Sequence, residues 1–583
     1  METINLKING REYDIPKNVT VLEACRIAGV EIPTLCYLKD INEIGACRMC
    51  VVEIKGARSL MAACVYPVDQ LRPGSEIITN SPALIDARRK TLELILSNHN
   101  RSCLSCVRSG SCELQQLAQE YGVENEGVYD GAKTPSEVDD TAVHMIRDNS
   151  KCILCRRCTA ACKNLQSVAV IGPNGRGFSS RIGSAFEAGL GEVSCVSCGQ
   201  CITVCPTGAL HEKDETAKVT AAIQDPEKFV VVQTAPAVRV GLGEEFGQPI
   251  GSIVTGKMVA ALRRLGFDKV FDTNFSADLT IWEEGTEFLE RYSTKENLPL
   301  ITSCSPGWIK FCEYYYPEFI PNLSTCKSPQ GMFGAVAKTY YAEKLGIDPK
   351  NIFVVSIMPC TAKKYEAQRP ELSASGYPDI DVTLTVRELA RMIRKNGILF
   401  NQLPDEEFDS PFGLGSGAGT IFGATGGVME AALRFAVEKV TGQNLEKPEF
   451  HEVRGVEGIK EAEYDLNGNI VKVAVVSGLT NAKELLDMVK SGEKYYDFIE
   501  VMACPGGCVN GGGQPIQPSN VRNVIDIRAE RAKGLYQDDA NLPKRKSQDN
   551  DDVKALYEEY LGEPGGHKAH EILHTHYTKR EKY

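Results

Sequence analysis

The segments CILCRRCTAAC (residues 152–162) and CVSCGQCITVC (residues 195–205) are two copies of one cysteine pattern. Each copy reads C-x2-C-x2-C-x3-C, the spacing of chains that hold two 4Fe–4S clusters, in which the fourth cysteine of each copy binds the other cluster. Structural zinc sites usually have two separate C-x2-C pairs instead, and neither copy matches that arrangement. The predicted ligands are Cys152, Cys155, Cys158 and Cys205 for one cluster, and Cys195, Cys198, Cys201 and Cys162 for the other.

This repeat predicts a two-cluster bacterial ferredoxin domain over residues 140–212. A second group of cysteines lies nearer the N-terminus, spaced C-x10-C-x2-C-x13-C. Two short segments of alternating apolar and polar residues and then a helical run precede it in the sequence. That order suits a β-grasp ferredoxin-like domain over residues 1–78. Because the group has one tight pair rather than two, it favours a 2Fe–2S cluster over zinc. Its predicted ligands are Cys36, Cys47, Cys50 and Cys64.

A third group combines one histidine with three cysteines, spaced H-x3-C-x2-C-x5-C, after an amphipathic helical segment at 82–97. Taken alone, this donor set suits a Cys3His zinc site as well as an iron–sulfur cluster. Its position between two other cluster motifs favours a 4Fe–4S cluster with one imidazole ligand, in a domain over residues 79–120. Imidazole ligation is expected to shift the reduction potential, as in Rieske centres. The predicted ligands are His99, Cys103, Cys106 and Cys112.

The overall composition limits the classes of protein that fit. The chain has 583 residues and 22 cysteines, and a secreted disulfide protein would need an export signal that we do not find. A net charge of −12 argues against nucleic acid as a main partner. No apolar run reaches the roughly 18 residues of a membrane span. We therefore expect a cytoplasmic protein whose clustered cysteines bind metal, with no membrane or nucleic-acid partner.

Beyond residue 222, short apolar runs alternate with helical segments such as 257–265 and 386–395. This alternation predicts an α/β domain with largely parallel sheets over residues 222–583. Ligands of such sheets bind beyond the carboxyl ends of the strands. The expected strands are Phe229–Thr234, Lys269–Asp272, Pro299–Thr302, Ile352–Ile357, Val471–Val476 and Asp497–Met502.

Three cysteine motifs follow expected strands of this domain. They are TSCSPGW at 302–308, MPCTAK at 358–363 and EVMACPGGCVNGGGQP at 500–515. Thiolates from three strand ends can hold one cubane cluster, and glycine lets the backbone approach it closely. The isolated cysteines Cys25, Cys312 and Cys326 are expected to pack in the core instead.

With these motifs the chain resembles the iron-only hydrogenases over essentially its whole length, and in particular the catalytic subunit of NAD(P)-linked, electron-bifurcating members. The resemblance implies an H-cluster, a 4Fe–4S cube joined to a two-iron unit with CO, cyanide and a dithiolate bridge. It places Cys360, Cys504 and Cys508 on the cube, with Cys508 also bridging to the two-iron unit. Lys363 would hydrogen-bond a cyanide. The implied wall of the site consists of Ala235, Pro236, Gln330, Met358, Phe422 and Met502.

The first motif departs from the family pattern, which commonly has two consecutive cysteines before the proline. There the second cysteine binds the cube and the first relays protons, whereas this chain has Cys304 followed by Ser305. Registry from Pro306 puts Ser305 at the ligand position, but thiolate is the better ligand for iron in a soft-sulfur site. We therefore expect Cys304 to bind the cube and Ser305 or water to relay protons, with the opposite assignment open.

A charged segment upstream of the first motif resembles the proton route of this family. The resemblance assigns that route to Glu284, Glu287, Arg291 and Ser324. Carboxyl groups suit this role because burial can raise their pKa toward the working pH. Without the resemblance, an i,i+4 surface ion pair between Glu287 and Arg291 would be the ordinary interpretation.

The resemblance implies the reaction 2H⁺ + 2e⁻ ⇌ H2, with one 2Fe–2S and three 4Fe–4S clusters carrying electrons in series to the H-cluster. We find no glycine-rich nucleotide loop in the required setting, so flavin, NAD(P) and ferredoxin chemistry is expected from partner subunits. Maturation proteins would install the two-iron unit. Two other functions stay open. One is an electron-transfer subunit, since residues 1 to about 215 also resemble the large NADH-dehydrogenase subunit. The other is a cluster-assembly factor or hydrogen sensor.

Overall fold

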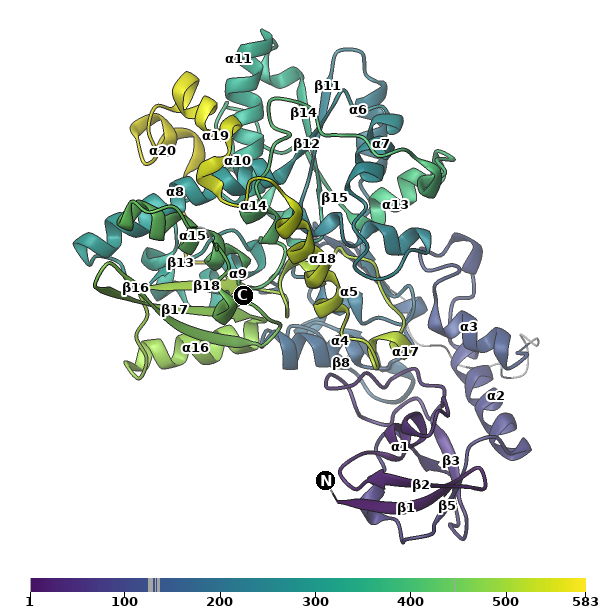
Figure 1. Cartoon of the computed structure of the whole chain (residues 1–583). Coiled ribbons are helices and arrows are strands. Elements are labelled where there is room, and N and C mark those ends of the chain that lie inside the picture. Colours follow the sequence, from purple (N-terminus) through teal and green to yellow (C-terminus); the bar gives the residue numbers. More distant parts are fainter. Residues whose placement is uncertain are drawn as a thin grey trace.

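The computed structural model describes residues 2–123, 129, 131, 133, 137–445 and 447–582. Figure 1 shows the N-terminal sheet at one end of the molecule and the large C-terminal α/β part at the other. The segments that carry the other cysteine motifs lie between them.

The N-terminal domain is a mixed sheet in the order β2-β1-β5-β3-β4 with one helix packed against it. Its elements are β1 (Thr3–Ile8), β2 (Arg11–Pro16), α1 (Val21–Ile27), β3 (Val51–Ile54), β4 (Met61–Ala62) and β5 (Glu76–Ile78). Helix α1 begins at a capping box, in which Thr20 and Glu23 each accept a backbone N–H of the other. The hairpin β1–β2 and the parallel pair β1–β5 confirm the β-grasp prediction.

The two copies of the cysteine repeat fold alike. In each, the third cysteine lies on a short helix, α4 for Cys158 and α5 for Cys201. The residue before each helix is left-handed, with φ 63° at Arg156 and 70° at Gly199. A small antiparallel sheet, β10-β7-β6, closes the domain. The elements from the third ligand group onward are α2 (Pro82–Ser97), α3 (Glu113–Glu120), β6 (Val138–Asp139), β7 (Met145–Asp148), α4 (Arg157–Ala160), α5 (Gln200–Thr203) and β10 (Leu210–Glu212).

The C-terminal part contains two four-stranded sheets rather than one continuous sheet. The first, in the order β12-β11-β14-β15, is entirely parallel. The second, in the order β13-β18-β17-β16, is parallel except for the hairpin β16–β17. The strands are β11 (Phe229–Thr234), β12 (Lys269–Asp272), β13 (Leu300–Ile301), β14 (Ile352–Met358), β15 (Val382–Thr385), β16 (Ile459–Leu466), β17 (Asn469–Ser477) and β18 (Phe498–Met502). This arrangement confirms the α/β prediction.

Helices cover both faces of each sheet, which is why the strands are apolar runs. The first sheet packs on α7 and α13 on one face and on α8, α10, α19 and α20 on the other. The second packs on α9 and α16 on one face and on α8 and α15 on the other. The helices are α7 (Thr255–Leu265), α8 (Thr273–Thr294), α9 (Pro306–Tyr315), α10 (Pro329–Val336), α13 (Val386–Lys395), α15 (Gly427–Thr441), α16 (Leu479–Ser491), α19 (Asp551–Leu556) and α20 (His567–Leu573). Helix α8 thus packs against both sheets.

A segment near the C-terminus returns to the cluster-binding domains before the long helix α18 (Ile527–Asn541), which Figure 1 shows running along the middle of the molecule. Its Ser519 hydroxyl donates to Glu113 at 2.6 Å, and the side-chain oxygen of Asn523 accepts from the N–H of Lys39 at 2.8 Å. It therefore binds both small N-terminal domains to the rest of the chain. Within the described residues, we find no helix that is long and apolar enough to cross a membrane.

Candidate active site and cluster ligands

A cavity with an empty volume of about 810 Å³ lies where strands of the two sheets end. Strand β14 of the first sheet leads to Cys360, and β13 and β18 of the second lead to Cys304 and Cys504. The carboxyl ends of parallel strands thus converge here, as expected for α/β sheets. The cavity brings together these predicted residues: Ala235, Pro236, Cys304, Ser305, Gln330, Met358, Cys360, Lys363, Phe422, Met502, Cys504 and Cys508.

The donor set and the backbone of this cavity fit an iron–sulfur group. Burial, followed by the charges of neighbouring thiols, raises the pKa of Cys508 to about 12 and that of Cys504 still further, so these thiols need a metal to become thiolates at neutral pH. No disulfide joins any cysteine of the described chain. A Cβ at Gly511 would lie 2.0 Å from the carbonyl oxygen of Pro359, so only glycine permits this close approach of two loops.

The two residues of the first motif, Cys304 and Ser305, make different contacts. The Ser305 hydroxyl accepts a hydrogen bond from the N–H of Ala503, which precedes the predicted ligand Cys504. Cys304 is half-buried, and burial of its thiol raises its pKa, as do the charges of Glu284, Cys508 and Glu500, against the lowering charge of Lys363. Both side chains line the cavity; the Ser305 hydroxyl lies beside the backbone of Ala503, and the Cys304 thiol lies near Glu284 and Cys508. These contacts favour Ser305 as a ligand of the cube and Cys304 as the proton relay. The preference of iron for thiolate had favoured the opposite assignment.

Lys363 is held at the cavity wall by three hydrogen bonds. Its Nζ donates to the Ser328 hydroxyl at 2.7 Å, to Glu366 at 2.8 Å and to the carbonyl oxygen of Cys304 at 3.2 Å. Sequence reasoning missed Ser328 and Glu366. The signals that could have found them are the position of Ser328 before Pro329, typical of a helix N-cap, and the i,i+3 spacing of Lys363 and Glu366.

The predicted proton-route residues lie together: Glu284, Glu287 and Arg291 are on α8, and Ser324 is on the segment between α9 and α10. Glu284 is buried, and among the described residues neither carboxylate oxygen has a hydrogen-bond partner by distance and angle. Burial raises the pKa of Glu284 to about 8, and the charges of Glu287 and Glu500 add to this, against the lowering effect of Ser324. The Ser324 hydroxyl donates to Glu287 at 3.0 Å, and Arg291 donates to Glu287 at 2.6 Å. The ion pair is therefore part of this cluster rather than an isolated surface pair.

The cysteines of the repeat surround two separate cavities, in the crossed arrangement that the spacing predicts. Cys152, Cys155, Cys158 and Cys205 line one cavity, which has an empty volume of about 390 Å³. Cys162, Cys195, Cys198 and Cys201 line the other, of about 460 Å³. Cys198 also lines the large cavity between the sheets, so the second cluster cavity and the candidate active site share a wall.

The two N-terminal ligand groups differ in how fully the structure assembles them. Among the four N-terminal cysteines, the Cys50 and Cys64 sulfurs lie 3.3 Å apart, and the N–H of Cys47 donates to the Cys36 sulfur at 3.4 Å. In the third group, Cys106 lies close enough to Cys112 to raise its pKa, after the larger effect of burial. Burial lowers the pKa of His99 to about 4, and its Nδ1 is buried without a hydrogen-bond partner in the described chain. The described contacts do not join His99 to those thiols.

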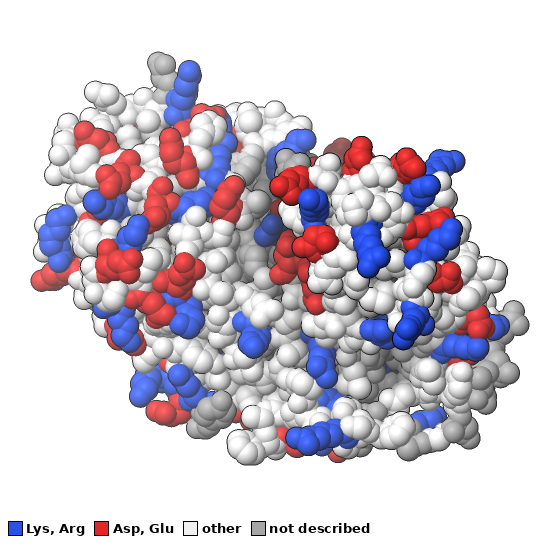
Figure 2. Space-filling view, turned by 90° about the horizontal axis from the view of Figure 1, so that it is seen from below, with Lys and Arg blue, Asp and Glu red and all other residues white. Residues whose placement is uncertain are grey.

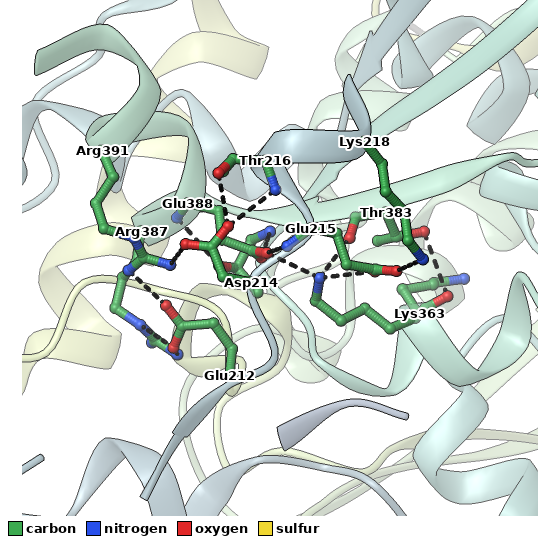
Figure 3. Close-up of polar contacts among 12 residues, drawn as sticks. Glu212, Asp214, Glu215, Thr216, Lys218, Lys363, Thr383, Arg387, Glu388 and Arg391 are labelled. Atoms are coloured by element: carbon green, nitrogen blue, oxygen red, sulfur yellow. Dashed lines mark hydrogen bonds and ion pairs between the residues drawn. The ribbon is translucent and has the colours of Figure 1, made fainter. Parts of the chain in front are cut away.

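Buried charges fasten the cluster-binding domain to the α/β part (Figure 3). Glu212, at the end of β10, accepts from Arg387 at 2.7 Å and from Arg391 at 2.7 Å. Lys364, next to Lys363, donates to Glu215 and to Glu388, each at 3.0 Å. This network holds the second cluster cavity and the candidate active site in a fixed relation.

On the face seen in Figure 2, acidic and basic side chains are interspersed over the described residues. This view shows no single charge sign gathered over one domain of that face within the described chain.

With this fold and this site, the chain belongs to the iron-only hydrogenase family. Family models match it along its length: a 2Fe-2S iron-sulfur cluster binding domain at 1–82, the NADH-ubiquinone oxidoreductase-G iron-sulfur binding region at 88–126, a 4Fe-4S dicluster domain at 151–209, the C-terminal domain of the iron-only hydrogenase large subunit at 228–512, and the iron hydrogenase small subunit at 525–580. Sequence reasoning had not separated the last region from the domain expected at 222–583.

Among its relatives, the chain is 48% identical to the NADP-reducing hydrogenase subunit HndD of Solidesulfovibrio fructosivorans, over 100% of both chains. It is 44% identical to iron hydrogenase 1 of Clostridium pasteurianum, over 98% of this chain and 99% of that one. A solved structure of the apo hydrogenase HydA1 from Chlamydomonas reinhardtii is 44% identical with a TM-score of 0.57, and covers 63% of this chain and 100% of its own.

These comparisons confirm the family, the multidomain α/β class and the predicted activity. The chain is an iron hydrogenase, an oxidoreductase that acts on H2, with 2Fe–2S, 4Fe–4S and H-cluster domains.

Proposed function

We propose that this hydrogenase exchanges electrons with NAD(P)H and ferredoxin through partner subunits, and passes them through one 2Fe–2S and three 4Fe–4S clusters to the H-cluster. The observation that carries the proposal is the shared wall at Cys198, since it joins the cluster-binding domain to the candidate active site. The full-length relative described as an NADP-reducing hydrogenase subunit supports the choice of nicotinamide. The domains would span 1–78, 79–120, 140–212 and 222–583.

The proposed cluster ligands are those predicted from spacing. The crossed cavities support the two 4Fe–4S sets of the repeat, and the close sulfurs support the 2Fe–2S set. For the third set, the buried and unpartnered Nδ1 of His99 is the supporting observation among the described residues. A nitrogen in that state is costly unless a metal occupies it.

Cys360, Cys504, Cys508 and the Ser305 hydroxyl oxygen would hold the proposed catalytic cube, and Cys508 would also help to hold the two-iron unit. When bound, the H-cluster supplies the redox chemistry and the heterolytic cleavage or formation of H2. Lys363, whose Nζ donates to Ser328 and Glu366, would hydrogen-bond a cyanide of the two-iron unit. The apolar wall of Met358, Phe422 and Met502 excludes water from the site.

Protons would pass between the cavity and the surface through the chain's own side chains. The Cys304 thiol exchanges a proton with the Glu284 carboxyl group, which is protonated at neutral pH because burial raises its pKa to about 8. Ser324, which lies near enough to Glu284 to lower its pKa and whose hydroxyl donates to Glu287, would carry the proton between the two carboxyl groups. Arg291 holds Glu287 in place.

The contacts favour a forked electron path rather than a single series. Asn42 joins the backbone of the 2Fe–2S loop to that of Cys155. A Cβ at Gly208, three residues after Cys205, would lie 2.6 Å from the sulfur of Cys106, a predicted ligand of the third group. The loop that carries Cys106 therefore packs against the segment that follows Cys205. Both N-terminal clusters would then deliver electrons to the cluster of Cys152, Cys155, Cys158 and Cys205. From there the path leads to the cluster of Cys198 and the active site.

Maturation proteins would install the two-iron unit, and the protein would act in the cytoplasm, since free thiolate ligand sets persist in reducing compartments.

A decisive experiment uses the matured chain alone and with a flavin-containing partner subunit. We expect H2 evolution from a reduced dye with the chain alone, and NADP reduction by H2 only after the partner is added. NADP reduction by the single chain would overturn the coupling proposal.

A further inference from the structure

The C-terminal segment brings a histidine against the proposed proton route. The N–H of Thr575 donates to the carbonyl oxygen of Thr325 at 2.8 Å, and that of Lys327 donates to Leu573 at 2.8 Å. These two backbone bonds hold His574 between them, opposite Cys326. Donor atoms of Glu287, Cys326 and His574 all lie within 4.8 Å of one another. His574 therefore lies close to Glu287, the last carboxylate of the proposed proton route.

One hydroxyl joins the carboxylate to the imidazole. The Thr325 oxygen lies 3.2 Å from Glu287 and 2.7 Å from Nδ1 of His574. A hydroxyl has one proton and two lone pairs, so it can accept a proton from one neighbour while it donates its own to the other. This arrangement permits a proton to pass between Glu287 and His574 through one hydroxyl.

The other ring nitrogen of His574 faces a buried carboxylate. Its Nε2 lies 3.0 Å from Glu283, which has 1% of its surface exposed and also accepts from the Tyr557 hydroxyl and from the N–H of Gly565 at 2.9 Å. This carboxylate faces the side of the ring opposite Thr325, so both nitrogens of the imidazole have hydrogen-bond partners. The ring of the exposed His570 on α20 lies 4.0 Å from that of His574, centre to centre, and leads to solvent.

We propose that His574 is a proton-relay residue that extends the route from Glu287 through the Thr325 hydroxyl toward the molecular surface at His570. In the outward step, Glu287 gives its proton to the Thr325 oxygen while the Thr325 proton moves to Nδ1 of His574. The hydroxyl is restored, Glu287 becomes a carboxylate and the imidazole becomes an imidazolium, so one proton is transferred and no electron moves. The inward step is the reverse. This inference rests on the proposed proton route from Glu284 to Glu287.

The test compares three variants of the matured chain. His574→Gln keeps hydrogen-bonding groups but cannot carry a proton, His574→Gly opens space for added imidazole, and His567→Gln changes an exposed histidine at the start of α20. We expect H2 evolution to fall roughly tenfold or more in both His574 variants, with a larger solvent deuterium isotope effect. Imidazole should restore the Gly variant but not the Gln variant, and His567→Gln should match the unmodified chain.

Two further readouts separate a relay from a structural clamp. Dithionite reduction of the clusters, followed by electron paramagnetic resonance, should be unchanged in all variants. Unmodified rates in His574→Gln, or a loss with an unchanged isotope effect and no imidazole rescue, would overturn the relay. Failure of the unmodified chain to evolve H2 would instead count against the proposed function itself.

Discussion

The side-chain amide of Asn42 lies 3.0 Å from the carbonyl oxygen of Cys155, a predicted ligand in the cluster repeat. The same nitrogen lies 2.8 Å from the carbonyl oxygen of Cys36, a predicted ligand of the 2Fe–2S cluster. Asn42 has 4% of its surface exposed, so both bonds are shielded from water. One buried amide thus fixes two ligand loops from separate domains and sets the relative position of their clusters.

Replacing Asn42 with Ala should loosen this junction. Two buried carbonyl oxygens would lose their donor, at a cost of about 1–3 kcal/mol to the docking of the N-terminal domain. Stopped-flow spectroscopy should then show slower electron transfer from the 2Fe–2S cluster, with H2 evolution from a dye that reduces the later clusters preserved. Asn5→Ala, which removes an exposed bond to Asp14, is the matched control. Equal transfer rates in both variants would count against a role for Asn42.

Cysteine replacements should reveal the crossed ligation of the repeat. Cys205→Ala should impair the same cluster as Cys155→Ala, although the two residues belong to different copies, because both line one cavity. Each variant should lose about four iron atoms or give an altered cluster, and their paramagnetic resonance spectra should match. A Cys205→Ala spectrum that matched Cys195→Ala instead would show ligation within each copy.

The roles of Cys304 and Ser305 can be separated in protein that lacks the two-iron unit. Because Ser305 faces Ala503 and Cys304 faces Glu284, Ser305→Ala should weaken the signal of the catalytic cube and Cys304→Ala should preserve it. Ser305→Cys should retain the cube at least as well as the unmodified chain, since thiolate binds iron better. Mössbauer spectra and iron content provide the measurement. Loss of the cube in Cys304→Ala alone would restore the assignment expected from ligand softness.

Glu284 should make the protein less stable as the pH rises. Its pKa is about 8 in the folded state against 4.5 as a reference, so between these values the unfolded chain releases a proton that the folded chain keeps. The contribution of Glu284 to the free energy of unfolding is fully present below pH 4.5. It decreases as the pH rises from 4.5 to 8, by at most about 1.4 kcal/mol per pH unit. Glu284→Gln removes this dependence and should raise Tm more at pH 8 than at pH 6.

The same variant should lose most H2 evolution, because glutamine cannot carry the proton. Glu463→Gln changes an exposed carboxylate and serves as the control for Tm and for activity. An equal Tm change at both pH values would contradict the raised pKa of Glu284.

Much of this architecture could be predicted because the cysteines that bind one cluster are spaced along the sequence in recognisable patterns. Four thiolates must reach one cluster, so the repeat and the motif around Cys504 predicted the cavities that the structure contains. The buried strand Phe229–Thr234 was also predicted correctly, because both faces of a parallel sheet are covered and every residue can be apolar. Strand β16 was missed, since its exposed face carries charged residues such as Glu461 and Glu463.

Other features depend on contacts between distant segments, which spacing cannot show. The direction of Ser305 and Cys304 is set by Ala503 and Glu284, about 198 and 20 positions away in the chain. His574, close to the C-terminal end of the described residues, pairs with the buried Glu283, nearly three hundred positions earlier in the chain. Its segment is held by backbone bonds that leave no pattern in the sequence.

Infrared spectroscopy on the anaerobically purified, matured chain, combined with an H2-evolution assay, tests the central claim most directly. The cavity between the two sheets predicts bands from iron-bound CO and cyanide together with H2 production, and predicts the loss of both in Cys508→Ala. Full iron loading and competent maturation without such bands would contradict the account, and would favour an electron carrier or an assembly factor built on the same fold.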